Sequence, residues 1–193
     1  MSKLVIPQIF RETAKKYQNN DALAKKDQVT EQYKFITYQE VQERVNCLAS
    51  AMLEFKLEKD EKVAVMSENS PEWVISDLGL MSAAILNVPV YPTLTYFQLE
   101  YILNNCGARG IIVSNDVHYQ KVVKLFDKAE HLEFVIYVDD VKKVEHSRVK
   151  TYSFAEILEL GKNNLEKNKT KIDERTESIQ EEDVCSIIYT SGT

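Results

Sequence analysis

Short apolar runs that alternate with helix-start signals constrain the fold of this chain more than any other feature of its sequence. A strand is predicted at each apolar run, which gives strands at 62–66, 88–91, 110–113, 134–138 and 184–189. Each run is short and apolar on both faces, which is typical of a strand in a parallel sheet. The sequence therefore predicts an α/β fold with a mostly parallel, helix-covered sheet.

Three capping boxes predict where helices begin, because each pairs a hydroxyl residue with Glu or Gln three positions later. They are Thr37 with Glu40, Thr95 with Gln98, and Ser153 with Glu156. Ser70 before Pro71 adds a fourth start, and Gly107 is a predicted helix end. The predicted helices cover about 38–55, 71–85, 96–106, 116–128 and 153–168.

The remaining segments flank this repeat. An amphipathic helix is expected at 8–17, followed by a hairpin with strands near 22–26 and 31–36. From 166 to 183 the chain is rich in both charges and is expected to be a connection.

Charge and cysteine content limit which partners and which cellular compartment are expected. The 24 basic and 30 acidic residues leave a net charge of −6 with no basic cluster, so no nucleic acid partner is expected. Cys47, Cys106 and Cys185 form neither a CxxC pair nor an even set, which favours a reduced compartment. Without a secretory signal the expected location is cytoplasmic. Peripheral contact at the inner face of the membrane stays open.

Ligands of parallel sheets bind beyond the carboxyl ends of the strands. The segments to search are therefore 67–70, 115–116, 139–140 and 190–193. Thr190 to Thr193 is the strongest candidate, because hydroxyl groups and backbone N–H groups around a glycine suit a polyphosphate. An ordinary turn is the alternative, and no GxxxxGK[ST] pattern occurs.

Other polar residues are weaker candidates. Asp139 and Asp140 are interpreted as a solvated loop. His118, His131 and His146 have no ligand partner at helical spacing, so surface or cap roles are expected. No catalytic residue and no metal ligand is assigned within the chain.

The order of these segments resembles the AMP-forming adenylating enzymes, the superfamily of acyl-CoA synthetases, luciferases and peptide-synthetase adenylation domains. Ile188 to Thr193 is similar to the opening half of their phosphate-binding loop. Residues 35–41, 62–66, 69–73 and 88–93 resemble earlier regions of the family in the same order. Within the superfamily, the 90–95 stretch is most similar to long-chain fatty acyl-CoA synthetases. One departure is Ala84, where the family usually has Gly.

The resemblance implies a ligase that uses ATP and Mg²⁺ to activate a fatty acid as an acyl-adenylate and then transfers it to coenzyme A. Thr190, Ser191 and Thr193 would donate hydrogen bonds to the ATP phosphates, and Gly192 would permit close backbone approach. Residues 1–193 would be the N-terminal part of the adenylating domain, cut within the phosphate-binding loop and lacking the C-terminal domain. The chain alone would be inactive.

Two alternatives remain open from the sequence. The chain could be a non-enzymatic α/β module completed by a second chain encoded downstream. It could also belong to another acid-activating member of the superfamily.

Overall fold

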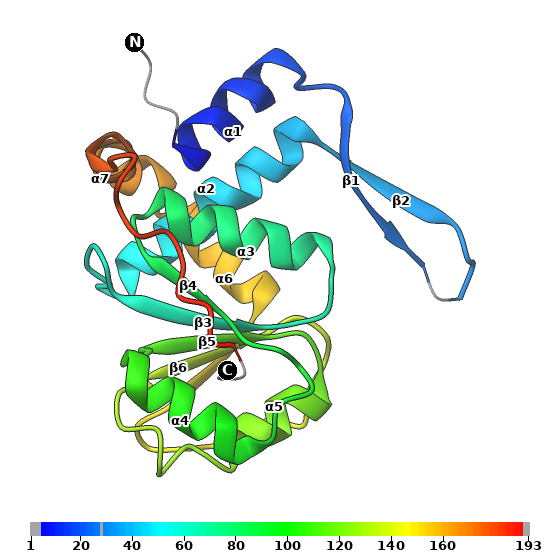
Figure 1. The fold of residues 1–193 in the computed structure, drawn as a ribbon. Coiled ribbons are helices and arrows are strands. Elements are labelled where there is room, and N and C mark those ends of the chain that lie inside the picture. Colours follow the sequence, from blue (N-terminus) through cyan, green and yellow to red (C-terminus); the bar gives the residue numbers. More distant parts are fainter. Residues whose placement is uncertain (1–4, 28, 191–193) are drawn as a thin grey trace.

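The computed structural model describes residues 5–27 and 29–190, and its centre is a five-stranded sheet (Figure 1). All neighbouring strands are parallel, in the order β4-β3-β5-β6-β7. They are β3 (Lys62–Met66), β4 (Leu86–Pro89), β5 (Gly110–Val113), β6 (Phe134–Tyr137) and β7 (Lys150–Ser153). The predicted α/β fold with a helix-covered parallel sheet is confirmed.

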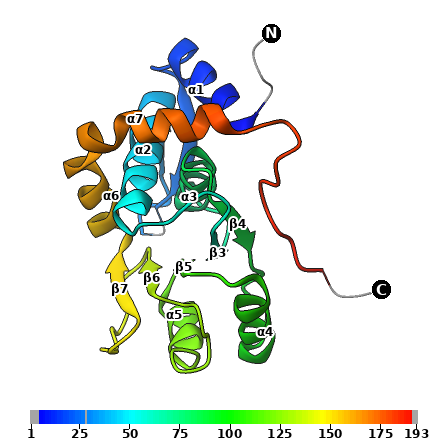
Figure 2. The same cartoon turned by 90° about the vertical axis from the view of Figure 1, so that its left-hand side faces the viewer.

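Helices cover both faces of this sheet, as Figure 2 shows. One face carries α2 (Tyr38–Glu54), α3 (Pro71–Ser82) and α6 (Phe154–Asn163), and α7 (Leu165–Ser178) packs on the outer side of these helices. The other carries α4 (Tyr96–Cys106) and α5 (Asp116–Val123). Each face has its own apolar core, and these cores include the fully buried side chains of Leu48 of α2 and Tyr119 of α5 respectively. Burial on both sides explains why the central strands β5 and β6 carry no polar side chain that lacks an apolar body, whereas the edge strand β7 is polar and less buried.

The N-terminal elements lie against the α2 and α3 layer. Helix α1 (Ile6–Lys16) precedes an antiparallel hairpin of β1 (Asp21–Lys26) and β2 (Tyr33–Thr37) that projects from the body (Figure 1). These elements confirm the predicted helix and hairpin.

Local chemistry fixes the helix starts. All three predicted capping boxes form, with the Thr37, Thr95 and Ser153 hydroxyls accepting the N3 backbone N–H. Ser70 accepts from the Trp73 backbone N–H, and Gly107 ends α4 in the left-handed region at φ 67°. Each cap satisfies a backbone group that the helix end would otherwise leave unpaired.

Two predicted boundaries were wrong at the α3–β4 connection. The helix ends at Ser82 rather than near Ile85, and β4 begins at Leu86 rather than Val88. The Ala84 N–H donates to Met81 O at 2.9 Å and the Ile85 N–H to Leu80 O at 2.9 Å, which is the Schellman pattern. Ala84 occupies its left-handed position at φ 56°, where glycine is usual.

We expect Ala84→Gly to raise the free energy of unfolding by up to about 1 kcal/mol, because it relieves the left-handed penalty of a residue with a Cβ. Loss of the buried methyl group offsets part of this gain. Ala83→Gly is the matched control, since Ala83 has an ordinary φ of −88° and should lose stability. Urea unfolding checks both variants. Equal losses in the two would contradict this account.

The second half of the chain departs further from the sequence prediction. The helix expected over 116–128 stops at Val123, because the Arg148 guanidinium binds carbonyl groups between 126 and 132 and holds that stretch in turns. The helix expected over 153–168 is two helices that meet at Asn164. Strand β7 was not predicted.

The expected connection at 166–183 is mostly helix α7. Its inward face carries Asn168, Ile172, Arg175 and Thr176, all buried. Three of these four residues are polar or charged, so an apolar periodicity could not reveal the face.

Candidate functional site

The carboxyl ends of β3 and β5 form the topological switch point of the sheet. Helix α3 follows β3 on one face of the sheet and leads to β4, whereas α5 follows β5 on the other face and leads to β6, so the connections diverge between β3 and β5 (Figure 2). Crevices at such points are the usual ligand sites of doubly wound sheets. Three of the four loops predicted to carry chemistry, 67–70, 115–116 and 139–140, meet at this edge through contacts with Ser114 or Asn115.

A polar cluster of Glu68, Ser114 and His118 fills this position. Ser114 Oγ lies 2.5 Å from Glu68 Oε2 and 2.9 Å from His118 Nδ1. His118 Nε2 lies 3.4 Å from Glu68 Oε1. Ser114 and His118 are buried, whereas the Glu68 side chain is exposed. The surface role expected for His118 was therefore wrong, because the first turn of α5 directs its ring inward beside Ser114.

The proton positions follow from the charges. Burial alone would raise the pKa of the Glu68 carboxyl, but the hydrogen bond from Ser114 and the nearby His118 lower it. Burial lowers the pKa of His118 against the attraction of Glu68. An ionised Glu68 can only accept, so Ser114 donates its proton to Glu68. His118 Nδ1 must then carry the proton that it donates to Ser114 Oγ.

We expect stability to fall as the pH drops below 6.5, the ordinary pKa of histidine, because folded His118 binds its proton more weakly than unfolded His118. The stability that neutral His118 contributes is fully present above pH 6.5. It is lost as the pH falls from 6.5 through the lowered pKa of His118 in the folded protein. His118→Asn keeps an amide donor near the Nδ1 position without titrating. Urea midpoints measured between pH 7.5 and 5.5 should therefore depend less on pH in this variant. An unchanged dependence would contradict the assignment to His118.

The segment leading to the predicted phosphate loop lies on the outer side of β4, at the edge of the sheet (Figure 1). The strand expected at 184–189 was wrong, because this segment makes one parallel bridge, between Ser186 and Asn87. Asn87 N–H donates to Cys185 O at 3.4 Å, and Ile187 N–H donates to Asn87 O at 3.0 Å. The next outward position of β4 is Pro89, which has no N–H to continue the ladder.

Thr190 is exposed at the end of this segment, just after Tyr189. Tyr189 donates from its hydroxyl to Asn105 Oδ1 at 2.5 Å and meets the Tyr101 ring edge to face. Strand β4 lies between the bridge at Ser186 and β3, the strand that leads to Glu68. The other predicted loop residues, Ser191, Gly192 and Thr193, lie outside the described residues.

The remaining candidates have structural roles. Asp139 and Asp140 are exposed, as expected of a solvated loop, and His131 is exposed. His146 accepts from the Val149 N–H and lies 3.1 Å from Asp127. Within residues 5–27 and 29–190, no three His, Cys, Asp or Glu side chains gather as metal ligands would.

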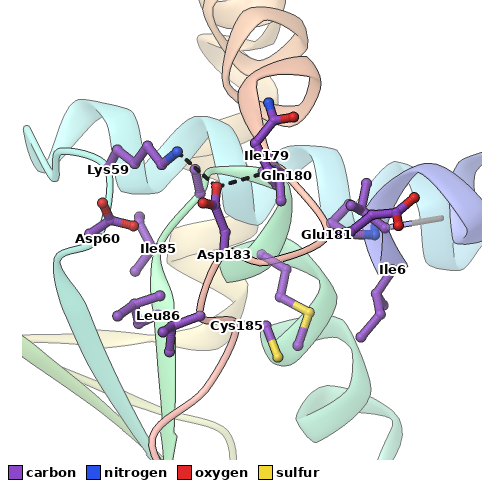
Figure 3. A pocket seen from close by; sticks show the side chains of 15 residues that line it. Ile6, Lys59, Asp60, Ile85, Leu86, Ile179, Gln180, Glu181, Asp183 and Cys185 are labelled. Atoms are coloured by element: carbon purple, nitrogen blue, oxygen red, sulfur yellow. Dashed lines mark hydrogen bonds and ion pairs between the residues drawn. The ribbon is translucent and has the colours of Figure 1, made fainter. Parts of the chain in front are cut away.

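Figure 3 shows a pocket of about 210 Å³ between α1, the α3–β4 connection and the 179–185 segment. Its walls are largely apolar, with Ile6, Ile85 and Leu86 among them. At its rim the Lys59 ammonium pairs with Asp183 at 2.9 Å. The pocket offers apolar contact area where these three segments meet. The sequence did not predict it, because its lining residues lie far apart along the chain.

None of the helices in the described residues combines the length and the apolar character that crossing a bilayer requires.

Curated relatives match almost the whole chain. A long-chain-fatty-acid–CoA ligase of Xenopus laevis, ACSBG2, is 31% identical over 191 residues, which cover 98% of this chain and 25% of that protein. A chloroplastic long-chain-fatty-acid–[acyl-carrier-protein] ligase of Arabidopsis thaliana, AEE15, is 27% identical over 97% of this chain and 26% of its own length. The chain thus spans about a quarter of the length of these relatives.

Solved structures share the fold. A long-chain-fatty-acid-CoA ligase from Archaeoglobus fulgidus, FadD1, aligns with a TM-score of 0.73 at 24% identity, over 100% of this chain and 36% of that one. The anthranilate CoA ligase AuaEII, solved with anthranoyl-AMP, aligns with a TM-score of 0.74 at 21% identity, over 96% and 32%. The family model for AMP-binding enzymes matches residues 10–193. The chain therefore belongs to the AMP-binding enzyme family.

Proposed function

We propose that these residues form the N-terminal part of the adenylating domain of an AMP-forming long-chain fatty acid–CoA ligase. The observation that carries the proposal is the family match over residues 10–193, together with curated relatives named as long-chain fatty acid–CoA ligases. The parallel sheet, with the segment before Thr190 bridged to its edge strand at Ser186, supports this role.

The proposed reaction has two steps. A fatty acid carboxylate attacks the α-phosphorus of ATP, which forms an acyl-adenylate and releases pyrophosphate. The coenzyme A thiol then attacks the acyl carbonyl, which forms the thioester and releases AMP and a proton. Mg²⁺ would accompany ATP and neutralise phosphate charge.

This chain would contribute phosphate contacts. We assign hydrogen-bond donation to the hydroxyl groups of Thr190, Ser191 and Thr193, and close backbone approach to Gly192. The exposed position of Thr190 supports access by a nucleotide. No residue of the chain is proposed as a nucleophile or a metal ligand.

Pyrophosphate exchange tests the adenylation step. The natural protein would be incubated with ATP, Mg²⁺ and labelled pyrophosphate, with palmitate, hexanoate or benzoate as the acid. We expect labelled ATP with palmitate and far less with the two smaller acids. Exchange with benzoate alone would point to another acid-activating member of the family. No exchange with any acid would overturn the proposal and favour a non-enzymatic module.

We expect Thr190→Val to lower kcat/KM for ATP by about tenfold to a hundredfold, because one hydrogen bond to a charged phosphate group contributes about 1.5–3 kcal/mol. Valine keeps the shape of threonine, so stability should change little at this exposed position. Thr151→Val, in β7, is the control for hydroxyl removal away from the loop. An unchanged kcat/KM for ATP in the Thr190 variant would contradict the assigned role.

A further inference from the structure

The 184–190 segment depends on one residue of the sheet for its register. Successive backbone N–H groups along β4 point in opposite directions. Leu86 of β4 and Val90, the residue just after it, donate their N–H groups toward the β3 side, to Glu61 O and Val65 O. The outward positions are therefore Asn87 and Pro89. Proline has no N–H, so Asn87 alone in β4 offers the segment both a donor and an acceptor.

The side chain of Asn87 is held by the helix layer, on α3, rather than by the 184–190 segment. It is fully buried, and its Nδ2 donates to Asp77 Oδ1 of α3 at 2.7 Å. Burial raises the pKa of Asp77, while the hydrogen bond from Asn87 acts against this shift. The amide therefore ties the edge strand to the helix layer beside it.

A buried asparagine at position 87 costs folding free energy that an apolar side chain would not cost. Within the described part of the chain, Asn87 Oδ1 is buried without a hydrogen-bond partner. An unpaired buried acceptor costs about 1–3 kcal/mol, which an apolar side chain would avoid. A polar side chain here thus favours a role in positioning the backbone over a role in core stability.

Resting on the proposed function, we propose that Asn87 is a positioning residue. Anchored to Asp77, it holds the single β4 position that binds the 185–187 backbone, and so it places Thr190 and the start of the phosphate-binding loop. Nucleotide binding would depend on this anchor although neither side chain touches the nucleotide. Small displacements of groups that orient substrates reduce catalytic efficiency strongly.

Four variants of the natural protein separate positioning from stability. Asn87→Leu and Asp77→Ala each remove the side-chain hydrogen bond, and Asp77→Ala keeps the test open if the first variant does not fold. Asp77→Asn keeps a carbonyl acceptor for Asn87. Asn168→Leu makes the same Asn-to-Leu change in α7, where the buried amide binds Ser50 and Glu54 instead.

Amide hydrogen exchange measures directly whether the Asn87 side chain holds the 185–187 backbone against β4. The Ile187 amide donates to Asn87 O, so its exchange should accelerate at least about tenfold relative to Ile112 of β5 in the two disrupting variants. Asp77→Asn and Asn168→Leu should leave this ratio unchanged. Equal ratios in all five proteins, the unmodified one included, would overturn the anchor.

Steady-state kinetics measure whether loss of this backbone position weakens the use of ATP. Asn87→Leu and Asp77→Ala should lower kcat/KM for ATP about tenfold and leave KM for the fatty acid within twofold. Faster Ile187 exchange with an unchanged kcat/KM for ATP would overturn the positioning role. Absence of pyrophosphate exchange in the unmodified protein would instead overturn the proposed function, and hydrogen exchange would still decide the anchor.

Discussion

Gly161→Ala is expected to destabilise the protein by about 3 kcal/mol, the upper end of the usual cost of overpacking, because an added methyl group would overlap the backbone of another helix. An ideal Cβ at Gly161 of α6 would lie 1.7 Å from the Cys47 carbonyl oxygen of α2. Backbone atoms cannot rotate away as a side chain can. The two helices would have to separate, and both pack on the same apolar core.

Gly107→Ala provides the matched control. Gly107 has φ 67°, but the nearest atom to an added Cβ is His131 Cδ2 at 3.8 Å. This variant carries only the left-handed backbone penalty, about 1–2 kcal/mol. Urea unfolding of both variants tests the comparison. A loss in Gly161→Ala no larger than that in Gly107→Ala would show that α2 and α6 do not approach as closely as described.

Arg175→Met is expected to cost about 2–4 kcal/mol, because the buried guanidinium satisfies backbone groups that would otherwise be unpaired. Its Nη1 donates to Leu57 O at 2.8 Å and to Ala83 O at 3.2 Å, and its Nη2 donates to Glu58 Oε2 at 2.7 Å. One side chain of α7 thus binds the chain just after α2 and the end of α3. Methionine keeps an apolar stem of similar length, so the loss reports the hydrogen bonds.

The control is Arg11→Met. Arg11 pairs with Asp173 at 2.9 Å, and both side chains are more than a third exposed. Surface pairs of this kind contribute at most about 1 kcal/mol. Similar urea midpoints for the Arg11 and Arg175 variants would contradict the stabilising role of Arg175.

Sequence reasoning succeeded where the deciding chemistry is local. The box of Thr37 with Glu40 and the stop at Gly107 involve neighbours within a turn, so a short window contains the whole cause. The strands at Lys62–Met66 and Gly110–Val113 were predicted with their observed bounds, because burial on both faces leaves an uninterrupted apolar run.

Prediction from the sequence failed where contacts between residues far apart in the chain determine the structure. Helix α7 is held by contacts of Asn168 and Arg175 with residues more than a hundred positions away, which no local pattern records. The inward position of His118 depends on Ser114 and on Glu68, 46 residues upstream of Ser114. The predicted strand at 184–189 failed because a strand also needs a partner with free N–H groups, and Pro89 interrupts that partner.

Product analysis tests the proposed ligase activity most directly. The endogenous protein, captured with an antibody raised against this chain, would be supplied with ATP, Mg²⁺, coenzyme A and palmitate, and the products identified by mass spectrometry. The account predicts palmitoyl-CoA, AMP and pyrophosphate in equal amounts, with none formed when palmitate is omitted. Formation of ADP and phosphate, or no thioester with any fatty acid, would contradict it.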